Sequence, residues 1–197
     1  MNHVAHCLLS YPNEELLIGN FIGDYIKGSA WKKFPGGIQK GILFHRFIDA
    51  LADEHPTLRA LIESMRPFAG RFAGPVADVL CDHLLCRRWE ECVPYLDFEY
   101  FAHWAYAGLS SYCAYMPEPL RQRWPKMLHA RFLHLYRSRD GFAWTLERFA
   151  QRLSSPIDCL GVLQHLDSKS LSLEADLPRL FSDLEIATRQ WRLIHMD

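Results

Sequence analysis

His45 and Asp49 are four residues apart in a stretch whose apolar residues recur with the spacing of a helix face. Successive helical residues turn by about 100°, so both share one stripe with Ile38, Ile42 and Ile48. Burying an unpaired carboxylate costs several kcal/mol, so buried acids are normally paired, protonated or metal-bound. The stripe therefore predicts a group that neutralises Asp49, and imidazole beside carboxylate is a donor set that divalent metals accept.

Ionisable residues interrupt apolar patterns in other stretches too. Asp78 and Asp82 share a predicted helix face, and His83 follows directly. Asp24 falls on the apolar face of an earlier stretch, and His6 is close enough to the start of the chain to approach the same place. Three helices would each bring an acid inward, which favours a site for Mn²⁺, Mg²⁺ or Fe²⁺, and less exclusively Zn²⁺.

A structural interpretation of these residues stays open beside the metal site. His45 and Asp49 alone would be an ordinary hydrogen-bonded pair at helical spacing. Asp78 and Asp82 could instead cap a helix or form ion pairs with nearby arginines, namely Arg46, Arg59 or Arg71. The coincidence of six such residues on three apolar faces is what favours the metal.

Helices are expected to position all of these residues. The segments between Gly and Pro have helical rather than alternating periodicity, and we find no convincing strand, hairpin or repeat. The sequence predicts one all-α domain over residues 1–197. Its expected helices cover residues 13–27, 38–54, 56–66, 75–92, 97–114, 120–136, 140–153, 157–166 and 171–193.

Composition places the chain among ordinary globular proteins. It has 197 residues, 22 Lys and Arg against 23 Asp and Glu, and 49% hydrophobic residues, which excludes disordered, collagen-like and coiled-coil classes. We expect neither a secretion signal nor a membrane span. Six cysteines without a CxxC pair or a dense framework favour a reduced cytoplasm.

Several other function classes lack their motifs. The glycines form neither a P-loop nor a strand-flanked dinucleotide motif, so packing and turn roles are expected for them. No GxSxG is present, and no Glu-x-x-His pair supports a di-iron site. The aromatic residues at 95–115 are not interleaved with basic ones, so binding of nucleic acid is not expected.

Four motifs give the chain a resemblance to a known family. They are MNHVAH at 1–6, LLIGNFIGDYIKG at 16–28, GILFHRFIDALADEHPTLR at 41–59 and RFAGPVADVLCDHLLCRRW at 71–89. In this order and spacing they resemble the acyl carrier protein phosphodiesterases, a divergent branch of the HD phosphohydrolases. The resemblance implies an HD-like helical fold and hydrolysis of the phosphodiester between 4′-phosphopantetheine and a serine of acyl carrier protein.

The resemblance also implies a metal and a set of site residues. Family members resemble Mn²⁺ enzymes, with Mg²⁺, Fe²⁺ or Co²⁺ as possible substitutes, and Asp24 matches the family's key aspartate. The chain departs from the wider HD pattern because it has no His-Asp dipeptide, only the reversed Asp82-His83. The expected ligands are Asp24, His45, Asp49, Asp78, Asp82 and His83.

Hydrolysis by such a site would use a metal-activated water for in-line attack. We expect Asp24 to be catalytic, His6 or His83 to protonate the leaving serine oxygen, and Arg46 to hold a phosphate oxygen. His6 could instead only hold the N-terminal segment, and Arg46 could only neutralise an aspartate.

Residues 120–152 carry eight basic and two acidic residues, a net charge of +6. This segment would complement a small acidic carrier protein, although it could be simply a solvated basic face. Two other functions stay open: a promiscuous HD-like phosphohydrolase acting on nucleotides or small phosphoesters, and a carrier-protein binding module without catalysis. The sequence does not predict an oligomeric state.

Overall fold

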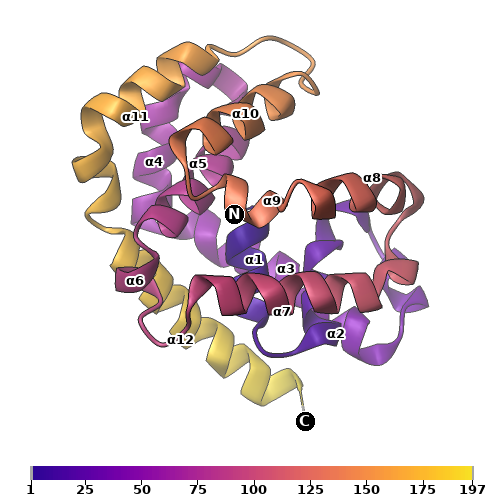
Figure 1. Cartoon of the computed structure of the whole chain (residues 1–197). Coiled ribbons are helices and arrows are strands. Elements are labelled where there is room, and N and C mark those ends of the chain that lie inside the picture. The colour runs from indigo at the N-terminus through magenta and orange to yellow at the C-terminus, as the bar shows by residue number, and fades with distance from the viewer. Residues whose placement is uncertain (1, 197) are drawn as a thin grey trace.

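The computed structural model describes residues 2–196, except for the side chains of residues 170–173. All regular elements within this range are α-helices or short 3₁₀ turns, which confirms the all-α prediction (Figure 1). They pack around one hydrophobic core. The terminal residues 1 and 197 of the predicted domain lie outside the described residues.

The helices follow one another with short connections. In chain order they are α1 (His3–Ser10), α2 (Glu14–Phe21), α3 (Gly36–Glu54), α4 (Pro56–Ala69), α5 (Ala73–Arg87), α6 (Trp89–Cys92), α7 (Phe98–Ser111), α8 (Glu118–His129), α9 (Phe132–Leu135), α10 (Arg139–Ala150), α11 (Cys159–Glu174) and α12 (Leu177–His195). The 3₁₀ turns are η1 (Gly23–Tyr25), η2 (Ala30–Lys33), η3 (Gly70–Phe72) and η4 (Cys113–Tyr115).

Most predicted helices are found, but some of their boundaries were wrong. The expected helix at 120–136 is divided into α8 and α9, because Arg131 adopts a left-handed backbone conformation with φ of 47°. Similarly, 75–92 is divided into α5 and α6. Near the C-terminus the interruption comes at residues 175–176, not in the predicted gap at 167–170.

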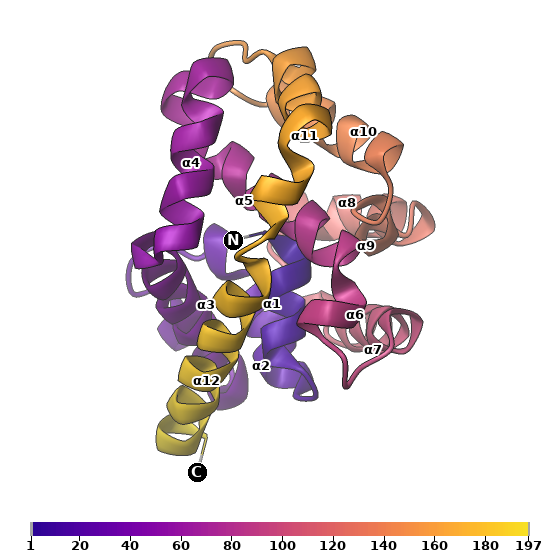
Figure 2. The same cartoon turned by 90° about the vertical axis from the view of Figure 1, so that its left-hand side faces the viewer.

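Helix α1 was not predicted, and its shortness explains why. It has eight residues, and every one from Val4 to Ser10 is buried. Helical periodicity is recognised over windows of about 11–18 residues, so a helix of this length offers too few positions to show it. Both views place α1 in the middle of the molecule, while α12 follows one edge toward the C-terminus (Figure 1 and Figure 2).

Helices α2 and α3 approach each other through two glycines. A Cβ atom on Gly19 would lie 2.3 Å from the carbonyl oxygen of Ile38, and one on Gly41 would lie 2.6 Å from that of Leu16. Only glycine permits this backbone contact. The packing role expected for the glycines is therefore confirmed here, and the contact brings the end of α2 against the middle of α3.

Candidate metal centre

Two buried histidines and a half-buried aspartate from two helices meet at one place. His6 of α1 and His45 and Asp49 of α3 each offer a ligand atom, and these atoms all lie within 4.8 Å of one another. Nε2 of His6 is 3.1 Å from Oδ1 of Asp49. Nε2 of His45 is 3.1 Å from Oδ2 of the same carboxylate. The two imidazole rings stack with centroids 4.3 Å apart, so they present the same edge to Asp49.

Asn20, the penultimate residue of α2, contacts the opposite edge of both rings. Its Oδ1 is 2.7 Å from Nδ1 of His6 and 3.2 Å from Nδ1 of His45. Its amide nitrogen donates to the carbonyl oxygen of His6 and to Oγ of Ser10, both at 2.8 Å. Asn20 is fully buried, and the sequence analysis gave it no role of its own.

Asp24 adjoins this cluster from the solvent side. Its Oδ1 is 3.3 Å from Nε2 of His45, and its side chain is 74% exposed. The predicted placement on the apolar face of a helix at 13–27 was wrong, because α2 ends at Phe21 and Asp24 belongs to the 3₁₀ turn η1. The structure therefore brings Asp24 to the site as its exposed carboxylate.

Gly23 allows this turn to pass directly over His45. A Cβ atom at position 23 would lie 2.2 Å from Cγ of His45. A side chain at this position would displace the imidazole or the turn that carries Asp24. Gly23 thus sets the distance between the buried histidine and the exposed aspartate.

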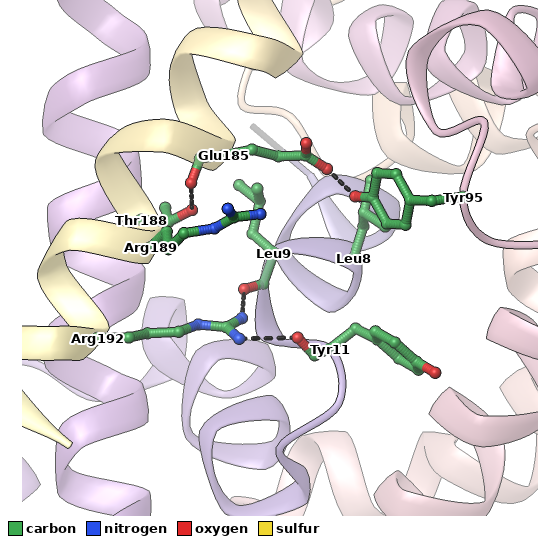
Figure 3. Close-up of a pocket in the computed structure, with 8 residues that line it drawn as sticks. All are labelled: Leu8, Leu9, Tyr11, Tyr95, Glu185, Thr188, Arg189 and Arg192. Atoms are coloured by element: carbon green, nitrogen blue, oxygen red, sulfur yellow. Dashed lines mark hydrogen bonds between the residues drawn. The ribbon is translucent and has the colours of Figure 1, made fainter. Parts of the chain in front are cut away.

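The helix that carries His6 is held at both ends by distant side chains. Asp82 of α5 accepts hydrogen bonds from the backbone N–H of Val4 at 2.6 Å and of Ala5 at 3.2 Å. Arg192 of α12 donates to the carbonyl oxygens of Leu9 and Tyr11 beside a small surface pocket (Figure 3). These bonds satisfy backbone groups that every helix leaves unpaired at its ends.

Asp82 and His83 therefore have other partners than the cluster. Nδ1 of His83 donates to the carbonyl oxygen of Tyr136 at 2.7 Å, and its ring stacks on Phe142. Both residues are fully buried. The structure does not place either of them among the ligand atoms around Asp49.

Two further predicted site residues lie beside the cluster without joining it. Arg46 donates from Nη2 to the carbonyl oxygens of Ile26 at 2.9 Å and Gly28 at 3.0 Å, and so holds the segment that follows Asp24. Asp78 is half-buried on α5, and burial raises the pKa of its carboxyl.

The electrostatics of the cluster differ between its two histidines. Burial lowers the pKa of His45, but hydrogen bonds to Asp24 and Asp49 outweigh this and raise the pKa to about 9. Burial dominates at His6 and lowers its pKa. The hydrogen bond from His45 holds the pKa of Asp24 below its usual range. Burial opposes ionisation of Asp49, yet bonds from His45 and His6 keep its pKa far below normal.

The donor set and its spacing fit a first-row divalent ion. Two ligand atoms at right angles, each about 2.1 Å from an ion, are separated by about 3 Å. Both Nε2 atoms are 3.1 Å from an oxygen of Asp49, which agrees with this spacing. Two imidazoles and a carboxylate suit Mn²⁺, Fe²⁺, Co²⁺ or Zn²⁺ better than an all-oxygen ion such as Ca²⁺.

Comparison with known proteins identifies the family of this chain. The family model described as acyl carrier protein phosphodiesterase matches residues 1–184. The chain belongs to the acyl carrier protein phosphodiesterase family. All of the cluster residues lie within the matched range.

Curated relatives carry the same family name. The acyl carrier protein phosphodiesterase of Enterobacter sp. (strain 638) is 29% identical over 152 residues, which cover 77% of this chain and 79% of the relative. The protein of that name from Salmonella agona (strain SL483) is 28% identical over the same shares. These relatives bear an enzyme's name. No solved structure matches the chain.

The described helices can also be compared with the length and hydrophobicity of a membrane span. Within residues 2–196, none combines the length and apolar character that crossing a bilayer requires.

Proposed function

We propose that this chain is a divalent-metal phosphodiesterase that releases 4′-phosphopantetheine from holo-acyl carrier protein and leaves the apo form. The proposal depends chiefly on one observation: His6, His45 and Asp49 converge within 4.8 Å, in a chain of this family. The exposed carboxylate of Asp24 beside them supplies the solvent side of the site. The HD-like relationship suggested by the sequence is part of the same proposal.

His6, His45 and Asp49 would hold the ion, with Mn²⁺ proposed first and Mg²⁺, Fe²⁺ or Co²⁺ as substitutes. When bound there, it would polarise the phosphoryl oxygens and lower the pKa of a water molecule from 15.7 toward about 7. His6 thereby takes the role of a ligand in place of the general acid expected from sequence. Both of its ring nitrogens already have partners, and its side chain is 4% exposed.

Asp24 is the residue best placed to act on the substrate side. Its side chain reaches solvent, where a carboxylate is ionised at neutral pH. A carboxylate in this state can accept the proton of the attacking water and orient its lone pair toward phosphorus. Arg46 supports it by holding the carbonyl oxygens of residues 26 and 28.

The carrier protein would dock on basic residues near Asp24. Within the predicted surface at 120–152, several arginines have acidic partners: Arg121 pairs with Glu118, Arg131 and Arg137 with Glu99, and Arg139 with Asp167.

Arg123 instead donates to the hydroxyl of Tyr25 at 2.9 Å, immediately next to Asp24. Lys126 on the same helix and Lys27 near the turn are exposed. We propose these three cations, Lys27, Arg123 and Lys126, as the part of the surface that receives the acidic carrier. Opposite charges there would speed encounter and make binding salt-dependent.

Intact-mass analysis of holo-acyl carrier protein tests the function directly. Incubation with the chain and Mn²⁺ should remove the phosphopantetheine mass, while a chelator or Asp24→Ala should prevent the loss. Arg59→Ala is a suitable control because the Arg59 side chain is exposed on α4 and donates to the backbone carbonyl oxygen of Asp53. An unchanged carrier mass in every tube would refute the proposal.

A small chromogenic phosphodiester separates the alternatives in the same experiment. Comparable turnover of this compound and of the carrier would favour a promiscuous phosphohydrolase. Binding of the carrier without turnover, and without stoichiometric metal, would favour a binding module.

A further inference from the structure

The orientation of the Asn20 side chain follows from its hydrogen bonds. Its amide nitrogen faces the carbonyl oxygen of His6, which only accepts, and Oγ of Ser10. The Ser10 hydroxyl donates its own proton to the same carbonyl, at 2.9 Å, and is therefore left as an acceptor toward Asn20. Oδ1 must then point at the two imidazole rings, because the reverse orientation would place an oxygen against two acceptors.

An amide oxygen can only accept, so both rings carry a proton on Nδ1. Nδ1 of His6 at 2.7 Å and Nδ1 of His45 at 3.2 Å are both N–H donors to Oδ1. Both Nε2 atoms face Asp49, whose carboxylate also only accepts, so without an ion a proton on Nε2 is favoured as well. A bound ion would replace the proton on each Nε2 and leave the Nδ1–H groups on Asn20.

We propose that Asn20 is a positioning residue that keeps Nδ1 of both His6 and His45 protonated, and so leaves Nε2 of each ring as the atom that binds the proposed metal. One buried oxygen would control two ligands on different helices. Partners of this kind hold a ligating histidine in orientation, and their loss typically reduces metal affinity about 10–100-fold. This inference depends on the metal site of the proposed function, but not on its substrate or reaction.

The surroundings of Asn20 exclude a mere filling role. Its side chain is fully buried, and leaving its amide unpaired there would cost about 1–3 kcal/mol. The glycines on either side of it, Gly19 and Gly23, bring the backbone close enough to α3 for a short side chain to reach His45. A leucine would fill a similar volume without an acceptor, and an aspartate would keep an acceptor without the amide donors.

Two-bond ¹H–¹⁵N correlation spectra of the histidine rings test this with Zn²⁺, which is diamagnetic, in place of Mn²⁺. The Zn²⁺-bound wild-type protein should show Nδ1–H and a metal-bound Nε2 for both His6 and His45. Asn20→Asp should retain this pattern, and Asn20→Leu should lose it. A protonated Nε2 or a metal-bound Nδ1 at either ring of the Zn²⁺-bound wild type would overturn the inference, even if Asn20→Leu fails to fold.

Mn²⁺ titration of the same variants, followed by the electron paramagnetic resonance of free Mn²⁺, tests the consequence for the site. Asn20→Leu should bind about 10–100-fold more weakly, and Asn20→Asp should remain within about threefold of wild type. Asn13→Ala is the matched control, because Asn13 lies at the other end of α2, where its side chain caps the helix by accepting from the backbone N–H of Leu16. Equal affinities of Asn20→Leu and wild type would overturn the inference.

The two readouts separate this inference from the proposed function. Correct tautomers in a protein that binds Mn²⁺ but leaves the carrier intact would support the positioning role and refute the phosphodiesterase. Turnover of the carrier by Asn20→Leu at the wild-type rate and metal affinity would do the opposite.

Discussion

Helices α3 and α5 have the same sequence signature and use it differently. Each places histidine and aspartate on a buried face: His45 and Asp49 on α3, Asp82 and His83 on α5. On α3 the ionisable groups contact one another and a second histidine from α1. On α5 they contact the backbone, the amides of α1 and the carbonyl of Tyr136.

The pKa values follow this difference in partners. Burial raises the pKa of Asp82 to about 7 and lowers that of His83 to about 4, so burial shifts both groups toward the neutral form. At His45 the neighbouring carboxylates outweigh burial, and the charged form is favoured. His45 keeps its charge because Asp24 and Asp49 lie beside it, and the same carboxylates could neutralise a metal cation. We infer that α3 supplies ligands of the proposed metal and that α5 holds α1 in place.

The largest expected difference between the two helices is in activity. Asp49→Asn should lower turnover of holo-acyl carrier protein by at least about 100-fold, because it removes a charge that the proposed metal needs. His83→Gln should leave turnover within about threefold. Both would be measured by intact mass, with circular dichroism to confirm folding. A greater loss in the α5 variant would reverse our assignment of the two helices.

The second prediction concerns stability. Asp82→Ala leaves the N–H groups of Val4 and Ala5 without their acceptor, at a cost of roughly 1–3 kcal/mol each. We expect the melting temperature to fall by about 5–15 °C, measured by calorimetry. Asp49→Asn should lower it less. If Asp82→Ala melts like the wild type but loses Mn²⁺ binding, Asp82 belongs to the metal site and does not merely hold α1.

The third prediction compares two groups of surface cations. Lys27→Glu with Arg123→Glu should raise the apparent KM for the carrier about five- to tenfold through lost complementarity. Arg131→Glu with Arg137→Glu removes charges already paired with Glu99 and should raise it less. Steady-state kinetics with a small phosphodiester as the second substrate provide the control. Equal effects on both substrates would argue against docking at this surface.

The smallest expected effect is the pH dependence of stability without added metal. The pKa of His45 is about 9 in the folded protein against 6.5 ordinarily, so its ion pairs stabilise the fold fully below about pH 6.5. This contribution should disappear as the pH rises through 9, and the melting temperature should fall by a few degrees. His45→Gln should flatten that part of the profile; the same slope in both proteins would contradict the assignment.

The sequence predicted helix α3 and its histidine–aspartate pair because one side of that helix is apolar. It did not predict that the helix ends before Asp24. The turn there packs Gly23 against His45, and a contact between residues 22 positions apart cannot be read from the local pattern. It also did not single out Asn20, because an asparagine inside an apolar run has no distinctive pattern. The choice between backbone and ionic partners for Asp82 depends on where α1 lies, and α1 itself was not predicted.

The bonds at the two ends of α1 also affect when, during synthesis of the chain, the proposed metal site can form. The ribosome makes His6 before either group that holds its helix, because the carboxylate that binds the start of α1 follows 78 residues after Val4. The arginine that binds the end of α1 follows 183 residues after Leu9. A nascent chain therefore holds all three proposed metal ligands before it reaches the groups that bind the two ends of α1, and both ends are held only after Arg192 has been synthesised.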